Sequence, residues 1–457
     1  MSTNMLSGSP LNKIIKFGLP ILIGNLFQQV YIAVDTIMIS AALNNDAVLA
    51  IGNAGILYTA LLWFIQGMAM GFAVLNSQAY GTCDAKKVRE SLAITFTLSG
   101  ILTILLTGFM LLSLDKTLQL INIAPASYQY AKDYLIIMYA GLGASLFLNV
   151  MLNSMRALGD ANHPLLYLVS ANILNIVLDY VFVIVLKMGT VGAGIATIIS
   201  QFSSFIGCMI SMYIKFPKFR LKFKDFISSK SYYLKHLTYA STNAIQFTII
   251  AFTLIAQQIF INKQSSDIMI GYVIGYKIDQ FAQQFIGAFA ISLATFVGQN
   301  FGAKNYERIK VGVKQTALMI AIISIAMTIV LLLLGRILTI IYLPNATVDI
   351  INASQKYIIY EASFYMFLAL LLVYRNASQN LGRYKLCFIA CLMEFTSRLV
   401  GVLAFGDSFD AIIMSNVIGW IGSCAILIPT YYLTMHKLTN KRIVIRKTNR
   451  RKFAFAH

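Results

Sequence analysis

The sequence is poor in charged residues. Only 12% of its 457 residues are Asp, Glu, Lys or Arg, whereas 58% are hydrophobic. Because soluble domains carry about 25% charged residues, this chain has too little polar surface to cover a large soluble globule. Acids are the scarcer charge: the chain has 17 Asp and Glu against 36 Lys and Arg, which gives a net charge of +19.

Sequence motifs of nucleotide-binding and metal enzymes are missing as well. The chain has no GxxxxGK[ST] loop and no HExxH pair. The five cysteines are scattered, and no His or carboxylate completes a zinc set beside Cys387 and Cys391. We interpret all five as small apolar residues. Since no nucleophile–base or metal constellation stands out, we expect neither an enzyme nor an organic cofactor.

The chain is built instead from long apolar blocks. About 20 residues span the hydrocarbon core of a bilayer as a helix, and helices are the expected form because lipid-exposed backbone must satisfy its own polar groups. The sequence therefore predicts an all-α integral membrane protein with twelve transmembrane helices. The blocks lie at about 15–41, 48–76, 91–113, 132–154, 164–186, 191–214, 237–262, 268–297, 313–343, 355–376, 385–405 and 411–434.

Basic residues are distributed unequally between the connectors. If the N-terminus lies inside, interior segments hold 28 of the 36 Lys and Arg, and exterior connectors hold six. By the positive-inside rule, this bias predicts a multi-pass protein of the cell membrane with both termini in the cytoplasm. We interpret the basic runs KFPKFRLKFK (215–224) and RIVIRKTNRRK (442–452) as cytoplasmic segments that face membrane lipids. Nucleic acid is not expected as a partner.

The two halves of the chain are similar to each other. The matching segments are LNSQAYGTCDAKKVRESL (75–92) with FVGQNFGAKNYERIKVGV (296–313), and NSMRALGD (153–160) with NASQNLGR (376–383). The offset is 221 between Gln78 and Gln299, and 223 between Gly159 and Gly382. The pattern predicts two pseudo-symmetric six-helix bundles, which run parallel because six is an even number. Transporters commonly use such repeats.

These features divide the chain into four expected parts. They are an N-lobe of six helices (1–214), a basic cytoplasmic linker (215–236), a C-lobe of six helices (237–435) and a basic cytoplasmic tail (436–457).

A carboxylate interrupts the apolar run NILNIVLDYVF (172–182). On a helix, Asn172, Asn175 and Asp179 share one face. A charged residue at the bilayer centre costs ~2.5–3.5 kcal/mol on insertion scales, so it needs a partner. The repeat breaks at this point, because an offset of 223 places Arg398 opposite Asn175. This asymmetry favours a function assigned to one lobe.

A second acid, Asp35, lies in the first block, and neither acid has a basic residue near it in sequence. We expect the two acids either to bind a proton reversibly or to ligate a hard cation together with oxygens of Asn175 and Thr197. The alternative is a permanently protonated acid that bonds to a helix neighbour. Tyr31 lies one turn before Asp35 and can donate to its carboxylate, and Pro20 favours a kink in the same helix.

The second half carries two further pairs of ionisable residues. Lys277 and Asp279 are two residues apart and do not face each other, and they are candidates for lining a substrate path. Glu394 and Arg398 are four apart with the acid first, which is the favoured order for a helical ion pair. We interpret them as a self-neutralising structural pair, with a role in transport as the alternative.

Together these features resemble the MATE family (multidrug and toxic compound extrusion). The resemblance rests on the six-plus-six helices, on Pro20, Tyr31 and Asp35 in the first helix, on N-x-x-L-D (175–179) in the fifth, and on the Gln-aromatic-Gly connectors. It covers about residues 10–435, and VGQNFGAKNYERI looks most like the DinF-like branch.

The resemblance implies two bundles in a V shape that open alternately to each side of the membrane. It implies export of amphipathic organic, often cationic, compounds in exchange for Na⁺ or H⁺ that moves inward. The implied N-lobe cation site, which would also hold the metal if the ion is Na⁺, consists of Asp35, Asn175, Asp179 and Thr197. The residues matched as supporting that site are Pro20, Tyr31 and Asn153.

One departure from the family pattern concerns the C-lobe. Another branch of the family uses acids in the seventh and tenth helices. Here the seventh block has no acid, and Glu361 near the start of the tenth has no clear match. We therefore place no cation site in the C-lobe.

Other functional classes stay open. A flippase for lipid-linked sugars has a related architecture but would need a basic central cavity for pyrophosphate. A channel or a non-transporting membrane sensor is a third class, and ion flux without saturation would favour the channel. The expected partners are small amphipathic organic molecules and membrane lipids, and we expect a monomer. The sequence does not separate Na⁺ from H⁺ and does not name the substrate.

Overall fold

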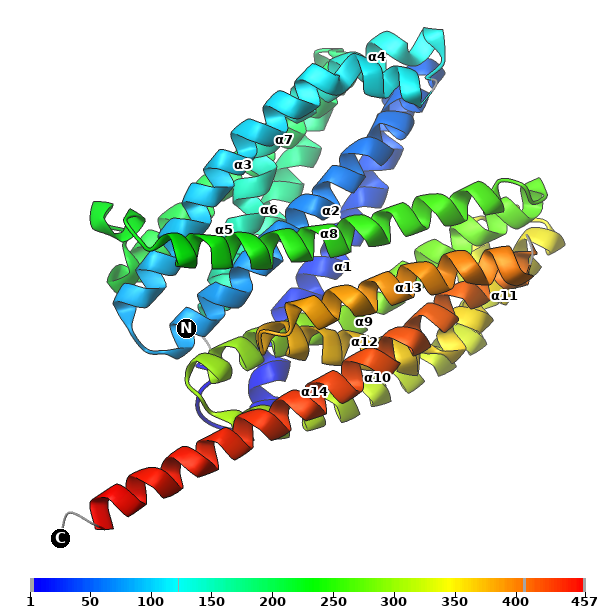
Figure 1. The fold of residues 1–457 in the computed structure, drawn as a ribbon. Helices are drawn as coiled ribbons and strands as arrows, with labels where there is room; N and C mark the ends of the chain where they lie inside the picture. The colour runs from blue at the N-terminus through cyan, green and yellow to red at the C-terminus, as the bar shows by residue number, and fades with distance from the viewer. Residues whose placement is uncertain (1–3, 122, 406–407, 455–457) are drawn as a thin grey trace. The chain divides into compact units, whose positions relative to one another are not determined.

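The computed structural model describes residues 4–121, 123–405 and 408–454, without the side chains of residues 45, 120, 402–405 and 441–454. Residues 455–457 of the expected tail lie outside the described residues. Every regular element in this part of the chain is a helix (Figure 1). In chain order these are α1 (Pro10–Ala42), α2 (Asn45–Gly81), α3 (Ala85–Leu120), α4 (Pro125–Ala140), α5 (Leu142–Ala157), α6 (Asn162–Asp179), the π-helix η1 (Tyr180–Val185), α7 (Gly189–Lys215), the 3₁₀ turns η2 (Pro217–Phe219) and η3 (Phe223–Phe226), α8 (Lys230–Ile261), α9 (Ser266–Gly302), α10 (Tyr306–Tyr342), α11 (Val348–Ser363), α12 (Tyr365–Asn380), α13 (Tyr384–Phe405) and α14 (Phe409–Ala454).

Most of these helices are long and apolar enough to cross a membrane. Nine helices within the described residues qualify, and the bent pairs α4–α5 and α11–α12 raise the number to eleven. Helix α13, which carries Lys385, Glu394 and Arg398, is not among them. With α13 the count reaches the twelve helices predicted. The chain has an all-α membrane fold.

The outward faces of the helices are apolar. In the most hydrophobic window of α10 the mean hydropathy is 3.0, yet only 17% of that window is buried. Leu333 of α10 is 73% exposed, and Leu112 of α3 is 88% exposed. Apolar surface of this extent is unfavourable in water, so these faces are suited to lipid.

Packing groups the chain into two compact units. Unit 1 contains Leu19–Ala251, and unit 2 contains Asn4–Gly18 with Phe252–His457. Helices α2–α7 belong to unit 1 and α9–α14 to unit 2, while α1 and α8 contribute residues to both. The division into lobes, linker and tail stays a prediction.

The same bent helix occurs once in each unit. In unit 1, α4 and α5 have 16 residues each and meet at an angle of 48°. In unit 2, α11 and α12 also have 16 residues each and meet at 50°. The first helix of each pair begins at Pro125 or at Val348, so the two bends are 223 residues apart, the same offset as between the matching glycines.

Two turns also recur with the same backbone geometry. Gly159 and Gly382 both have φ of +86°, and Cys83 and Lys304 both have φ of +57°. Glycine adopts this left-handed region without the steric cost that a Cβ brings. The internal repeat found in the sequence therefore extends to the course of the backbone.

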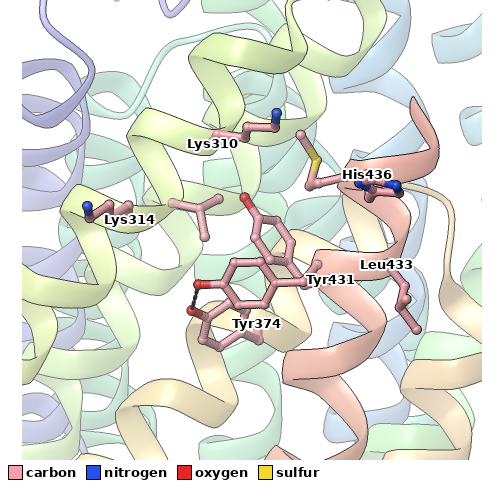
Figure 2. A pocket seen from close by; sticks show the side chains of 9 residues that line it. Lys310, Lys314, Tyr374, Tyr431, Leu433 and His436 are labelled. Atoms are coloured by element: carbon pink, nitrogen blue, oxygen red, sulfur yellow. Dashed lines mark hydrogen bonds between the residues drawn. The ribbon is translucent and has the colours of Figure 1, made fainter. Parts of the chain in front are cut away.

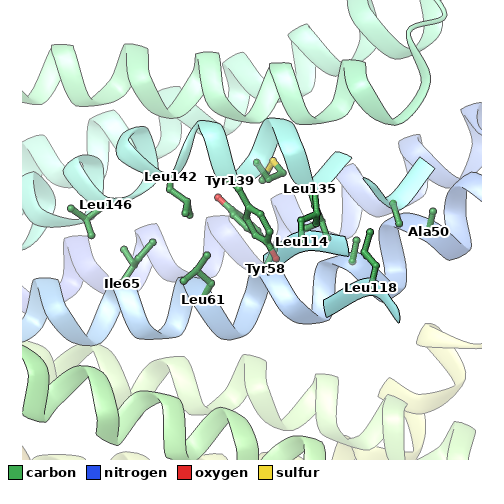
Figure 3. Packing of buried hydrophobic residues seen from close by; sticks show 13 residues of the cluster. Ala50, Tyr58, Leu61, Ile65, Leu114, Leu118, Leu135, Tyr139, Leu142 and Leu146 are labelled. Atoms are coloured by element: carbon green, nitrogen blue, oxygen red, sulfur yellow. The ribbon is translucent and has the colours of Figure 1, made fainter. Parts of the chain in front are cut away.

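The core of unit 1 forms around α2. Tyr58, Leu61 and Ile65 of α2 pack against Leu135 of α4 and Leu146 of α5 (Figure 3). The hydroxyl groups of Tyr58 and Ser145 are hydrogen-bonded at 2.8 Å, which satisfies the polar end of this buried ring. Helices α4 and α5 pack on α2 despite the break between them.

Small residues bring α2 and α8 into close contact. A Cβ on Gly71 would lie 2.5 Å from Cα of Ala240, and a Cβ on Gly67 would lie 2.6 Å from Cα of Ala244. Both helices thus present small residues four positions apart. Such pairs let helix backbones approach closely in membranes, where packing contributes much of the helix association.

We predict that Gly71→Ala destabilises the protein by ~1–3 kcal/mol, because the added methyl group forces the two backbones apart. Gly55→Ala on the same helix is the matched control, since a Cβ there meets no atom within 4 Å. Helix propensity then favours Ala by ~1 kcal/mol. Thermal unfolding of the purified protein in detergent measures both changes, and equal stability of the two variants would contradict the close packing.

Candidate functional site

The polar residues of α6 face the interior of unit 1. Asn172, Asn175 and Asp179 are buried, whereas Ile173 and Val177 between them are exposed. This agrees with the predicted shared face. The helix therefore separates an apolar outer side from a polar inner side in the middle of a membrane-spanning segment.

A change of helix type follows Asp179. This residue is the last of α6, and the next six residues form the π-helix η1. The N–H of Leu186 donates to the carbonyl oxygen of Val181, five residues earlier, at 2.9 Å. π-helical turns are rare and are frequently found at functional sites. The wider turn begins where the carboxylate is held.

The two acids of the first half come together. The carboxyl groups of Asp35 in α1 and Asp179 in α6 lie within hydrogen-bonding reach of each other. Oδ1 of Asp35 and both carboxyl oxygens of Asp179 are buried and accept no hydrogen bond from any donor in the described part of the chain. Two carboxylates in contact repel each other in a low dielectric.

Two tyrosines border this acid pair. The hydroxyl of Tyr31 donates to Oδ1 of Asn175, whereas the sequence suggested Asp35 as its acceptor. Tyr134 of α4 lies close enough to both Asp35 and Asp179 to interact electrostatically with them. Phenol hydroxyl groups are donors that can reorient toward a carboxylate. Sequence reasoning missed Tyr134, because nothing in its own segment distinguishes it from the neighbouring tyrosines.

The remaining predicted residues of the site lie on helices of the same unit. The hydroxyl of Thr197 in α7 donates to the carbonyl of Ala193 at 3.0 Å, which leaves its oxygen lone pairs free to accept. Asn153 in α5 is buried and donates to the carbonyl of Asn149 at 2.9 Å. Pro20 lies inside α1, which continues through it as a single helix. No hydrogen bond within the described residues joins Thr197 or Asn153 to the acid pair.

A cluster of charged residues connects α6 and α7, two helices that carry residues of the site. Asp160, in the turn before α6, is buried and accepts from Nζ of Lys215, the last residue of α7, at 2.8 Å. Nδ1 of His163 lies 2.9 Å from the same oxygen. Burial opposes ionisation of Asp160, but the hydrogen bonds from Lys215 and His163 outweigh it and hold the pKa of this carboxyl below its usual value.

Unit 2 holds a buried acid in a different environment. Asp279 of α9 is buried and accepts three hydrogen bonds from neutral donors. Nε2 of Gln283 lies 2.8 Å and the hydroxyl of Tyr357 lies 3.4 Å from Oδ2, and the hydroxyl of Tyr365 donates to Oδ1. Lys277, two residues earlier, is exposed, with Nζ 5.9 Å from the ring centre of Tyr342. The two residues therefore point to different surroundings.

Glu361 is a further buried acid of unit 2. Its Oε1 accepts from Nδ2 of Asn416 at 2.6 Å, and Oδ1 of Asn416 accepts from Nε2 of Gln257 at 2.6 Å. This chain of amides links α11, α14 and α8. The sequence offered one signal for the cluster: Tyr357, Glu361 and Tyr365 follow at intervals of four and lie along one side of the bent pair α11–α12.

Glu394 has two basic partners in place of the single one expected. Arg398 donates to its Oε1 at 2.7 Å, and Arg375 of α12 donates to its Oε2. All three side chains are nearly buried. The pair predicted from spacing is present, and a second guanidinium from another helix completes it as a triad with one excess positive charge.

We predict that Glu394→Gln costs ~3–5 kcal/mol of stability, because it leaves two buried guanidinium groups without a counter-charge. Glu307→Gln is the matched control, since Glu307 pairs with Lys310 at an exposed site and such pairs contribute ~1 kcal/mol or less. Thermal unfolding in detergent distinguishes the two. A Glu394→Gln protein of unchanged stability that no longer transports would instead support a role in transport.

The chain is similar in sequence to proteins of a known family. The sequence model of the family described as MatE matches residues 20–181 and 243–403. The probable multidrug resistance protein YpnP of Bacillus subtilis (strain 168) is 25% identical over 391 residues, which cover 85% of this chain and 86% of that protein. DNA damage-inducible protein F of Escherichia coli (strain K12) is 27% identical over 195 residues, 41% of each chain.

Some of these alignments are partial. The match to another probable multidrug resistance protein of Bacillus subtilis, YoeA, covers 65% of that protein.

The fold agrees over nearly the whole chain with the outward-facing structure of a multidrug resistance MATE family transporter of the MOP superfamily. The TM-score is 0.87 at 19% identity, and the alignment covers 96% of this chain and 99% of that one. The two family matches together span more than half of the sequence, so the chain belongs to the MatE family and is a multi-pass membrane transporter, not an enzyme.

Proposed function

We propose that the protein is a cation-coupled antiporter that exports amphipathic organic, often cationic, compounds by alternating access. Two of its relatives are named probable multidrug resistance proteins. The observation that carries the coupling is the contact between Asp35 and Asp179, in which Oδ1 of Asp35 and both carboxyl oxygens of Asp179 are buried and have no donor in the described part of the chain. A single positive charge, supplied by Na⁺ or by a proton, relieves the repulsion between the two carboxylates and leaves the pair with one net negative charge.

The contrast with unit 2 supports this assignment. Asp279 accepts three hydrogen bonds from Gln283, Tyr357 and Tyr365, so its charge is already stabilised by fixed neutral dipoles. Asp179 has no such donors and depends on a mobile cation. A carboxylate whose charge is stabilised only by a bound cation responds to the cation gradient. A carboxylate whose charge is stabilised by donors within the protein does not depend on that gradient.

The residues around the pair suit either coupling ion. Na⁺ is a hard ion that favours oxygen ligands, by analogy with other hard cations. Carboxyl oxygens of Asp35 and Asp179, the second lone pair of Asn175 Oδ1 and the hydroxyl oxygen of Thr197 would hold it. A proton requires only the two carboxyl groups, which then share it as one hydrogen bond. Tyr31 supports the site by donating to Oδ1 of Asn175, and we propose Asn153 as a supporting residue on the family resemblance.

Coupling requires that the cation binds two conformations of the protein with different affinity. Asp35 lies on α1, which contains Pro20, and Asp179 lies at the junction of α6 with a π-helix. Both elements have backbone hydrogen bonds that are interrupted or shifted in register. We propose that closure of the acid pair around the cation changes the bend of these helices and releases the exported compound.

The composition of the chain suits bulky apolar substrates. The chain contains 19 Met, 30 Phe and 24 Tyr. Methionine adapts its shape to different ligands, and tyrosine offers an apolar face with a polar edge. We propose that the protein acts as a monomer in the cell membrane with both termini in the cytoplasm. Lys277 and Asp279 remain candidates for the substrate path.

We predict that Asp35→Asn and Asp179→Asn each reduce gradient-driven uptake of a cationic dye into everted vesicles by about tenfold or more, because neither variant can hold the coupling cation. Asp46→Asn is the matched control, since Asp46 is an exposed acid in the first turn of α2. Wild-type uptake by both buried-site variants under Na⁺ and pH gradients would refute the coupling. Non-saturating ion flux would favour a channel, and transport of lipid-linked sugars without dye uptake would favour a flippase.

The identity of the ion is a separate prediction. Fluorescence of Trp63 and Trp420 is followed while Na⁺ is varied at fixed pH, and then while pH is varied at fixed Na⁺. For a Na⁺-coupled protein we expect saturable changes with Na⁺ that Asp179→Asn abolishes. For a proton-coupled protein only the pH titration shows a change that this variant abolishes, and no site-dependent change in either titration would contradict the proposed site.

A further inference from the structure

A cavity of about 510 Å³ lies in unit 2, where α10, α12 and α14 meet (Figure 2). Its walls combine basic and aromatic side chains, among them Lys310, Lys314, Tyr374, Tyr431 and His436. The volume falls within the range of small-molecule sites. We propose that this cavity binds the phosphate headgroup of an anionic phospholipid.

The charge of the cavity supports an anionic ligand. Lys314 forms no ion pair within the described part of the chain, and its side chain is exposed. Lys310, whose side chain is 40% exposed, pairs with Glu307 at 3.1 Å. His436 contacts Nδ2 of Asn440 at 2.9 Å. The single acid among these contacts is therefore already paired, and an excess positive charge remains at Lys314.

A buried hydroxyl group at the cavity is unsatisfied. Tyr431 is 3% exposed, and its hydroxyl has no hydrogen-bond partner in the described part of the chain. Figure 2 shows this hydroxyl turned toward α10, the helix that carries Lys310 and Lys314. The hydroxyl groups of Tyr374 and Tyr432 bond to each other at 3.3 Å. A buried donor without an acceptor is unfavourable, and a phosphate oxygen is a strong acceptor that would satisfy it.

The surface next to the cavity favours a lipid over a soluble phosphate. Leu318 and Ile322 follow Lys314 at intervals of four on α10, so the three share one face. Leu318 is 65% exposed and Ile322 is 59% exposed. An acyl chain can lie along this apolar stripe while its headgroup occupies the cavity. Basic pockets between membrane helices on the cytoplasmic side are suited to anionic headgroups.

The test is lipid binding by the full-length protein in detergent, measured by native mass spectrometry. Phosphatidylglycerol is the probe, and phosphatidylcholine with the same acyl chains is its neutral comparison. The variants are Lys314→Gln and Tyr431→Phe, and Lys116→Gln is the matched control, because Lys116 of α3 is an exposed lysine outside the cavity and outside the basic segments interpreted as facing lipid. The measurement needs no transport, so its outcome is independent of the proposed antiport.

We expect phosphatidylglycerol to bind more tightly than phosphatidylcholine, and each cavity variant to bind it about tenfold more weakly, because Lys314→Gln removes the positive charge that faces the phosphate and Tyr431→Phe removes a hydroxyl donor. The control is expected to bind as the parent does, and thermal unfolding of the variants in detergent is expected to be unchanged. Equal affinity of all four proteins, or equal binding of the two lipids, would overturn the proposal. Displacement of phosphatidylglycerol by millimolar inorganic phosphate or glycerol phosphate would show a soluble phosphate site and would also overturn it.

Discussion

The absence of water in the hydrocarbon core constrains every other feature of this protein. Backbone polar groups there must bond within their own helix, and so the described chain is helical throughout its regular elements. Departures from regular helix are costly under this constraint. They occur at the bends of α4–α5 and α11–α12 and at the π-helix after Asp179. We therefore interpret segments of irregular backbone as having a role besides crossing the membrane.

The same constraint explains the grouping of buried polar side chains. In unit 2, Asp279 accepts three hydrogen bonds from neutral donors, Glu361 accepts one from an amide, and Glu394 pairs with two guanidinium groups. Unit 1 leaves Asp35 and Asp179 facing each other. A buried carboxylate with hydrogen-bond or ion-pair partners is held in place by the protein, whereas a buried carboxylate without them favours binding of a cation. The difference in hydrogen bonding thus separates the acids that have donors within the protein from the candidate coupling acids.

The internal repeat shows how one backbone supports two roles. The turns at Gly159 and Gly382 have the same φ, and the bent pairs have nearly the same angle. The side chains nevertheless diverge at equivalent positions, because Asn175 of the acid-pair site corresponds to Arg398 of the triad. Backbone geometry was kept after duplication, and the polar chemistry inside each unit was not.

Local spacing in the sequence determined the spans, the repeat, the buried face of Asn172, Asn175 and Asp179, and the bond between Glu394 and Arg398, because residues on one helix have a fixed geometry. The family resemblance supplied Thr197 and Asn153 as members of the site. Only the tertiary structure brought Tyr134 to the acid pair, added Arg375 to Glu394 and assembled the lysine–tyrosine cavity. These contacts join helices far apart in the chain, and which faces of separate helices meet depends on their packing, which no local pattern encodes.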